Sequence, residues 1–166
     1  MISGGIIAFA VGAGIGLVIQ IVQIFIETSA EIDLLDNTSI DTIDVKSYTQ
    51  SCIEWCSKNL GGHPPILKYS RAKPTNTEQK KMLLGTYDFN SEVVTMYTLR
   101  HENLREYTNT VIHEYQHHIQ KLNGVTQNKY SRYEYETNPF EFECNRVADA
   151  HTLNCGIYAL KKLQAA

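Results

Sequence analysis

An uninterrupted apolar segment covers residues 4–26 of this 166-residue chain. Among its 23 residues only Gln20 and Gln23 are strongly polar, and none is charged. As a helix, the segment would span about 34 Å, enough to cross a hydrocarbon core of about 30 Å. Because backbone polar groups in lipid must be satisfied within the segment, we predict an N-terminal transmembrane helix. Residues 4–26 would then contact the membrane, and the protein would be a single-pass membrane protein.

The apolar segment also allows other interpretations. Thr28 and Ala30 have small side chains with the spacing of a signal-peptidase site, which would give a protein secreted after cleavage near Ala30. A buried hydrophobic hairpin, or a membrane-insertion segment of a toxin-like effector, is the third interpretation. Gly12 and Gly16 form a GxxxG pair, which would permit weak self-association between two such helices.

Charge is unevenly distributed along the chain. Residues 1–44 contain six acids and no Lys or Arg, whereas residues 45–166 contain 12 acids and all 15 bases. The formal net charge is −3, so the chain lacks the excess positive charge typical of nucleic-acid-binding proteins, and we predict no nucleic-acid partner. These contrasts divide the chain into an anchor or signal segment over 1–26, an acidic linker over 27–44 and one domain over 45–166.

The domain over 45–166 shows signals for both helices and short strands. The expected elements are a helix over 44–60, a strand over 66–72, a hairpin of strands over 83–87 and 92–98, and long helices over 102–122 and 138–163. Asp44 is a candidate N-cap for the first helix, and Pro139 suits the first turn of the last one. This order predicts a small α+β domain.

The first long helix contains His113-Glu-Tyr-Gln-His117, an HExxH motif. Residues i and i+4 project from the same helix face, so both imidazoles can bind one Zn²⁺. Glu114 lies one step round the helix, where it can take a proton from a metal-activated water. On a helical wheel both histidines point away from the apolar stripe, as expected of a helix that lines a cleft. We predict that His113 and His117 are metal ligands and that Glu114 is the catalytic base.

A catalytic zinc site needs a third protein ligand. The second long helix offers Glu141 and Glu143. Glu141 shares its helix face with small residues, which would let the two long helices pack closely, whereas Glu143 lies on a more polar side. We therefore predict Glu141 as the third ligand and keep Glu143 as the alternative.

The segment Glu141-Phe-Glu-Cys144-Asn145-Arg-Val-Ala148, following HExxH, resembles the E-x-x-A-N-x-hydrophobic-A segment of ImmA/IrrE-type gluzincin metallopeptidases. The resemblance covers about residues 83–160 and implies a small zincin-like fold with His113, His117 and Glu141 as zinc ligands and Glu114 as general base. It also implies an edge strand that pairs with an extended substrate, and we assign that role to residues 93–97. Cys144 replaces the family's usual Ala, so the prediction extends to the gluzincin class and not to the subfamily.

Other residues have less specific patterns. Peptide hydrolysis usually needs an oxyanion stabiliser, for which the candidates are Tyr130, Tyr133, Tyr135 and His151, with Tyr133 as the first guess. His118 falls at the edge of the apolar stripe and is predicted to pack in the core, whereas His63 and His101 are expected in loops without a special role. The four cysteines, Cys52, Cys56, Cys144 and Cys155, are predicted to be buried free thiols.

Together these patterns predict a membrane-anchored, zinc-dependent metallopeptidase that acts on a peptide or protein substrate. One alternative is a non-catalytic, zinc-stabilised domain that captures peptides or a partner at a membrane. The other is a protease effector or toxin whose apolar segment inserts into a membrane.

Overall fold

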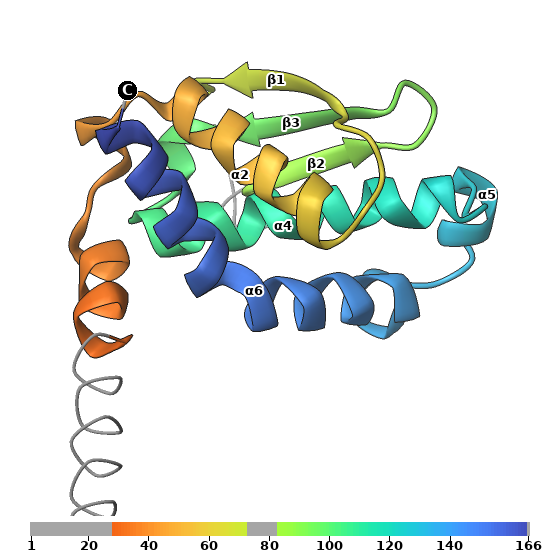
Figure 1. The fold of residues 1–166 in the computed structure, drawn as a ribbon. Helices are drawn as coiled ribbons and strands as arrows, with labels where there is room; N and C mark the ends of the chain where they lie inside the picture. The colour runs from red at the N-terminus through yellow and green to blue at the C-terminus, as the bar shows by residue number, and fades with distance from the viewer. Residues whose placement is uncertain (1–27, 73–82, 166) are drawn as a thin grey trace, which may run out of the picture. The chain divides into compact units, whose positions relative to one another are not determined.

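The computed structural model describes residues 28–72 and 83–165 (Figure 1). The chain divides into two compact units, residues 1–34 and residues 35–166. In the first unit the described residues, 28–34, are helical. The second unit contains a 3₁₀ turn at Ile40–Thr42, helices α2 (Val45–Asn59), α4 (Leu104–Leu122), α5 (Gln127–Tyr130) and α6 (Pro139–Gln164), and strands β1 (Ile66–Ser70), β2 (Gly85–Asp88) and β3 (Val93–Tyr97).

Local capping explains where the three long helices begin. The Asp44 side chain accepts hydrogen bonds from the first amides of α2, the Asn103 side chain accepts one from Glu106 N in α4, and the Asn138 side chain accepts one from Phe140 N in α6. The chain leaves α2 through Gly61 and Gly62, which both have positive φ. The predicted helices over 44–60, 102–122 and 138–163 are therefore confirmed.

The three strands form one mixed sheet in the order β1-β3-β2. β1 pairs with β3 in parallel, with Ile66 opposite Val93, and β2 pairs with β3 in an antiparallel arrangement, with Gly85 opposite Met96. Because β3 is hydrogen-bonded on both sides, its backbone cannot pair with a substrate. The prediction that residues 93–97 form the substrate-binding edge strand is wrong, and β2 is the edge nearer the predicted site.

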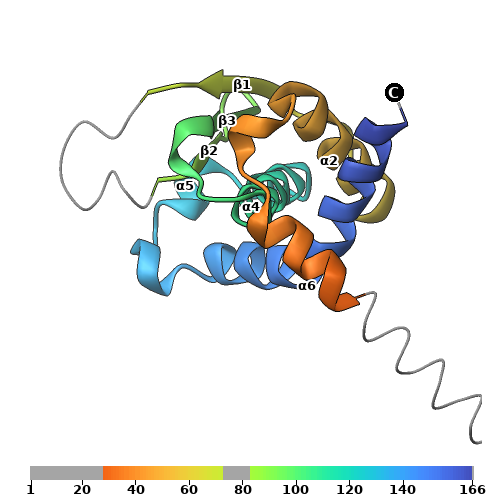
Figure 2. The ribbon, with the colours of Figure 1, turned by 90° about the vertical axis from the view of Figure 1, so that its left-hand side faces the viewer.

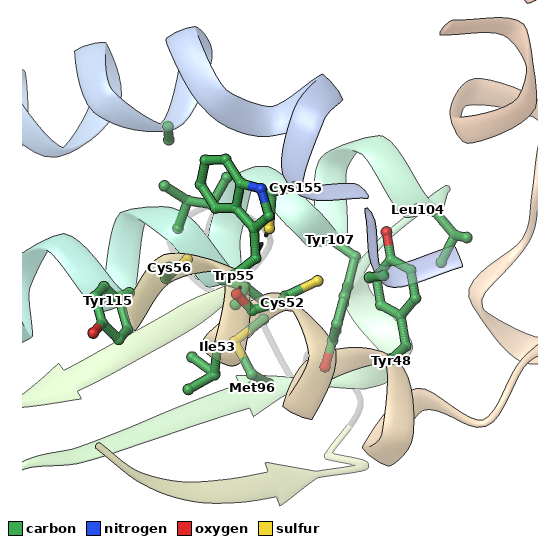
Figure 3. Packing of buried hydrophobic residues seen from close by; sticks show 14 of the residues in the cluster. Tyr48, Cys52, Ile53, Trp55, Cys56, Met96, Leu104, Tyr107, Tyr115 and Cys155 are labelled. Carbon is green, nitrogen blue, oxygen red and sulfur yellow. Dashed lines mark hydrogen bonds between the residues drawn. The ribbon is translucent and has the colours of Figure 1, made fainter. Parts of the chain in front are cut away.

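Helix α4 lies between the sheet and α6 (Figures 1 and 2). The hydrophobic core fills the space that α2, β3, α4 and α6 enclose, and Figure 3 shows Trp55 and Tyr48 of α2, Met96 of β3 and Tyr107 of α4 packed there. Two residues of the predicted acidic linker, Leu35 and Ile40, are also buried in this core.

Buried hydroxyl groups in the core have hydrogen-bond partners. Tyr48 Oη lies 2.6 Å from Thr108 Oγ1, and Tyr107 Oη lies 2.7 Å from Thr49 Oγ1. Each pair joins α2 to α4, so these polar groups fix the packing of the two helices without leaving an unsatisfied donor. The four cysteines, Cys52, Cys56, Cys144 and Cys155, are buried and free, as predicted.

The structure corrects the membrane prediction. Within residues 28–72 and 83–165, no helix has the length and apolar character needed to cross a bilayer. The long helices α4 and α6 carry charged residues such as Arg105, Lys121 and Asp149, which are costly in lipid. We therefore correct the fold class to an α+β domain with no membrane-spanning helix among the described residues, and we withdraw the single-pass membrane localisation. The segment 4–26, with Gly12 and Gly16, lies outside the described residues.

His101 is a buried histidine that the sequence did not distinguish. It is 7% exposed, with Nδ1 at 3.1 Å from Tyr97 O and Nε2 at 3.2 Å from Thr110 Oγ1. Burial lowers the pKa of His101 to about 4, so the folded protein resists protonation that the unfolded chain accepts below about pH 6.5. The stability that this neutral histidine contributes is present above pH 6.5 and is lost as the pH falls towards 4.

As the pH falls from about 7 to about 4, protonation of His101 in the unfolded chain should lower the free energy of unfolding by about 3 kcal/mol. Urea unfolding at several pH values should show a flatter acid limb for His101→Gln than for the wild type. His151→Gln, on α6 and outside both groups of candidate metal ligands, is the matched histidine control and should keep the wild-type acid limb. Equal pH dependence of the wild type and His101→Gln would contradict the prediction.

Candidate metal centre

The structure brings His113, His117 and Glu141 together at the junction of α4 and α6. His113 Nε2 lies 3.2 Å from Glu141 Oε2, and His117 Nε2 lies 3.1 Å from Glu141 Oε1. The one-turn spacing of the histidines on α4 aims both rings at α6, and the Asn138 cap fixes the first turn of α6, which contains Glu141. All three side chains are mostly buried.

The second nitrogen of each histidine is bound to an amide oxygen. His113 Nδ1 lies 2.9 Å from Asn145 Oδ1, and His117 Nδ1 lies 3.0 Å from Gln120 Oε1. Because an amide oxygen only accepts, each Nδ1 carries a proton, and each Nε2 can offer its lone pair to a metal ion. Both Nε2 atoms point to the same side as Glu141, which is the arrangement typical of metal-binding histidines.

Glu143, the alternative ligand, occupies a different place. Gln120 Nε2 donates to Glu143 Oε2 at 2.8 Å and to the Phe140 carbonyl at 2.9 Å. These two bonds orient the Gln120 oxygen towards His117, so Glu143 acts on the site through Gln120 and does not face the two Nε2 atoms. Sequence reasoning missed Gln120, although its position three residues after His117 places it within reach on the same helix.

The donor atoms fit a zinc ion. In a tetrahedral site with bonds of about 2.0 Å, donors lie about 3.3 Å apart, close to the 3.1 and 3.2 Å found here. Glu141 Oε2 is buried and has no hydrogen-bond partner among the described residues, which a bound cation would remedy. Burial opposes ionisation of Glu141, but the neighbouring His113, His117 and Tyr130 side chains outweigh it and hold its pKa well below the usual range.

Cys144 also lies near the histidines, as part of a group with His113 and His117 whose ligand atoms are within 4.8 Å of one another. Its sulfur is 3.4 Å from His117 Nδ1, the nitrogen that faces Gln120. Burial strongly raises the pKa of the Cys144 thiol, which disfavours the thiolate form that binds metals. These observations favour Glu141 over Cys144 as the third ligand.

A cavity of about 310 Å³ opens in front of these groups, with β2 and the residues that flank it as one wall. Glu114 lines the cavity and is 6% exposed, and burial raises its pKa despite the opposing effect of the two nearby imidazoles. A Cβ atom at Gly85 would lie 2.8 Å from Thr110 Cγ2 and 2.9 Å from Glu114 Cγ. Glycine at this position therefore lets β2 approach the α4 face that carries Glu114.

The outer edge of β2 is not paired with another described strand. Tyr97 N donates to Leu84 O at 3.1 Å, and the antiparallel register continues from there. Since hydrogen-bonded positions alternate in such a ladder, the backbone groups of Gly85 and Tyr87 point away from β3. No other described strand pairs with this edge.

Two of the four predicted oxyanion candidates lie at the cavity. Tyr130 and Tyr135 line it, and the Tyr130 hydroxyl donates to Glu141 Oε1. Tyr133 is 46% exposed and packs on Phe140, and His151 packs against Trp55, so neither lines the cavity. Partial desolvation and the charge of Glu141 raise the pKa of Tyr135 to about 12, which keeps its hydroxyl protonated at neutral pH.

Comparison of the chain with protein families, with curated protein sequences and with solved structures found no match.

Proposed function

We propose that the protein is a zinc-dependent metallopeptidase of the gluzincin type, with His113, His117 and Glu141 as ligands. The observation that most supports this is the convergence of two imidazole Nε2 atoms on the buried Glu141 carboxylate, one oxygen of which has no hydrogen-bond partner among the described residues. The amide oxygens of Asn145 and Gln120 also fix the orientation of the two imidazole rings, as such partners do for metal-binding histidines.

Zinc bound by these ligands would supply a Lewis acid that polarises the scissile carbonyl and lowers the pKa of a water molecule. Glu114 lines the same cavity and would accept the proton of the attacking water. Burial favours the neutral form of Glu114, so the carboxyl group can then pass this proton to the leaving amine.

The surrounding residues provide the other functions that peptide hydrolysis needs. We assign the oxyanion-stabilising donor to Tyr135, because the Tyr130 hydroxyl is already bound to Glu141. The outer edge of β2 at Gly85 and Tyr87, with which no other described strand pairs, would hold an extended peptide by β-strand addition. The substrate class is therefore a peptide or an unfolded protein segment.

Removal of metal from the full chain should abolish cleavage of a mixed peptide library. Addition of Zn²⁺ should then restore the cleavage. Metal removal should also lower the Tm, because an ion held at 100 times its Kd stabilises the folded state by about 2.7 kcal/mol. Mass spectrometry of the library and a thermal melt provide the two measurements. Cleavage that survives complete chelation would refute the proposed function.

A further inference from the structure

A second group of metal-ligating side chains lies away from the cavity. The ligand atoms of His63, Glu92 and His118 are within 4.8 Å of one another. His63 follows α2, Glu92 lies in the turn between β2 and β3, and His118 belongs to α4. His118 is next to His117 in the chain but is about 100° further round the helix, so it faces a different side of α4.

Hydrogen bonds leave both imidazoles with a lone pair. His118 Nε2 lies 2.9 Å from the His63 carbonyl, to which it must donate, so His118 Nδ1 is the lone-pair nitrogen. The Tyr87 hydroxyl, 3.1 Å away, donates to that nitrogen. His63 Nδ1 lies 3.3 Å from Pro64 O and donates to it, which leaves the lone pair on Nε2.

Backbone contacts hold the three segments together. Ile66 N donates to Glu92 O at 3.1 Å, and the Tyr115 hydroxyl donates to Gly61 O at 2.6 Å. Among the described residues, Glu92 is the one non-glycine residue with positive φ, at 57°. That conformation is disfavoured for a residue with a Cβ, and in this turn it accompanies a carboxylate that faces the two histidines.

We propose that His63, Glu92 and His118 form a second site for a divalent transition-metal ion such as Zn²⁺. Two imidazoles and one carboxylate are a suitable donor set for such an ion. The exposed His63 provides access from solvent. This inference does not depend on catalysis at the first site.

Binding at the second site requires local rearrangement. Zinc donors lie about 3.3 Å apart, and these ligand atoms lie within 4.8 Å of one another, but the Tyr87 hydroxyl must release His118 Nδ1 before that nitrogen can bind a metal. The second site is therefore weaker than the first. Tyr87 belongs to β2 and lines the cavity of the first site, so displacement of its hydroxyl by an ion here would change a side chain of that cavity wall.

The test is titration of the metal-free full chain with Co²⁺ and with Zn²⁺. Calorimetry and the visible absorbance of Co²⁺ measure how many ions bind. We expect about two equivalents for the wild type, one tight and one weaker, and about one tight equivalent for His63→Gln. Glu92→Gly should also lose the weaker equivalent, and it should remain folded because glycine suits the positive φ. These two variants avoid the fully buried His118.

Two controls separate this proposal from the first site. Glu141→Ala should keep the weaker equivalent while losing the tight one, and His151→Gln on α6 should keep both. The proposal is overturned if His63→Gln and Glu92→Gly bind as many ions as the wild type. It is equally overturned if the wild type binds a single equivalent that Glu141→Ala removes.

Discussion

Glu114→Gln is expected to lower kcat/KM by about 10²–10⁴-fold while the protein keeps its zinc. The amide has nearly the shape of the carboxylate, but it cannot accept a proton from the attacking water. Glu114 faces the cavity beside His113 and His117, and it does not lie between them as Glu141 does. The substitution should therefore change the proton transfer and leave the ligand set intact.

Peptide cleavage and zinc content of the Glu114→Gln protein should be measured on the same preparation. Glu106→Gln, in the first turn of the same helix, is the matched control and should retain wild-type activity. Cleavage at the wild-type rate by Glu114→Gln would contradict the assigned role. A wild-type protein that binds zinc but cleaves nothing in a broad library would instead favour the non-catalytic, zinc-stabilised binding domain.

Glu141→Ala is expected to weaken zinc binding by more than about 100-fold, because it removes a direct ligand and leaves two histidines. Glu143→Ala should weaken it by only about 10-fold, since Glu143 acts through the Gln120 side chain. Asn145→Ala, which removes the partner of His113 Nδ1, should weaken zinc binding by about 10- to 100-fold.

Competition with a chromophoric chelator would measure these zinc affinities on the full chain. Glu136→Ala is a suitable control, because Glu136 is an exposed carboxylate in the turn before α6. Zinc binding that is lost in Glu143→Ala and kept in Glu141→Ala would overturn the choice of ligand.

Helix boundaries were predictable because their signals are local. Asp44, Asn103 and Asn138 cap helices with hydrogen bonds to amides two or three residues ahead. The apolar stripe of α4 also indicated which way the HExxH histidines point. Sheet order was not predictable in the same way, because the pairing of β1 with β3 joins segments more than twenty residues apart.

The N-terminal segment shows a different limit. Length and apolar character alone led to a transmembrane helix over residues 4–26, and no helix in the described residues, 28–72 and 83–165, supports a membrane span. The sequence also did not predict the burial of Leu35 and Ile40, because the acidic residues around them gave residues 27–44 the pattern of a solvated linker.

By itself, the sequence determined that one helix carries two histidines and a glutamate on neighbouring faces, since a turn of 3.6 residues requires it. Only the tertiary structure decided that Glu141 meets both Nε2 atoms and that Glu143 orients Gln120 behind them. It also placed Gly85 of β2 against Glu114 and grouped His63, Glu92 and His118. These choices depend on contacts between residues distant in the chain, which helical periodicity does not encode.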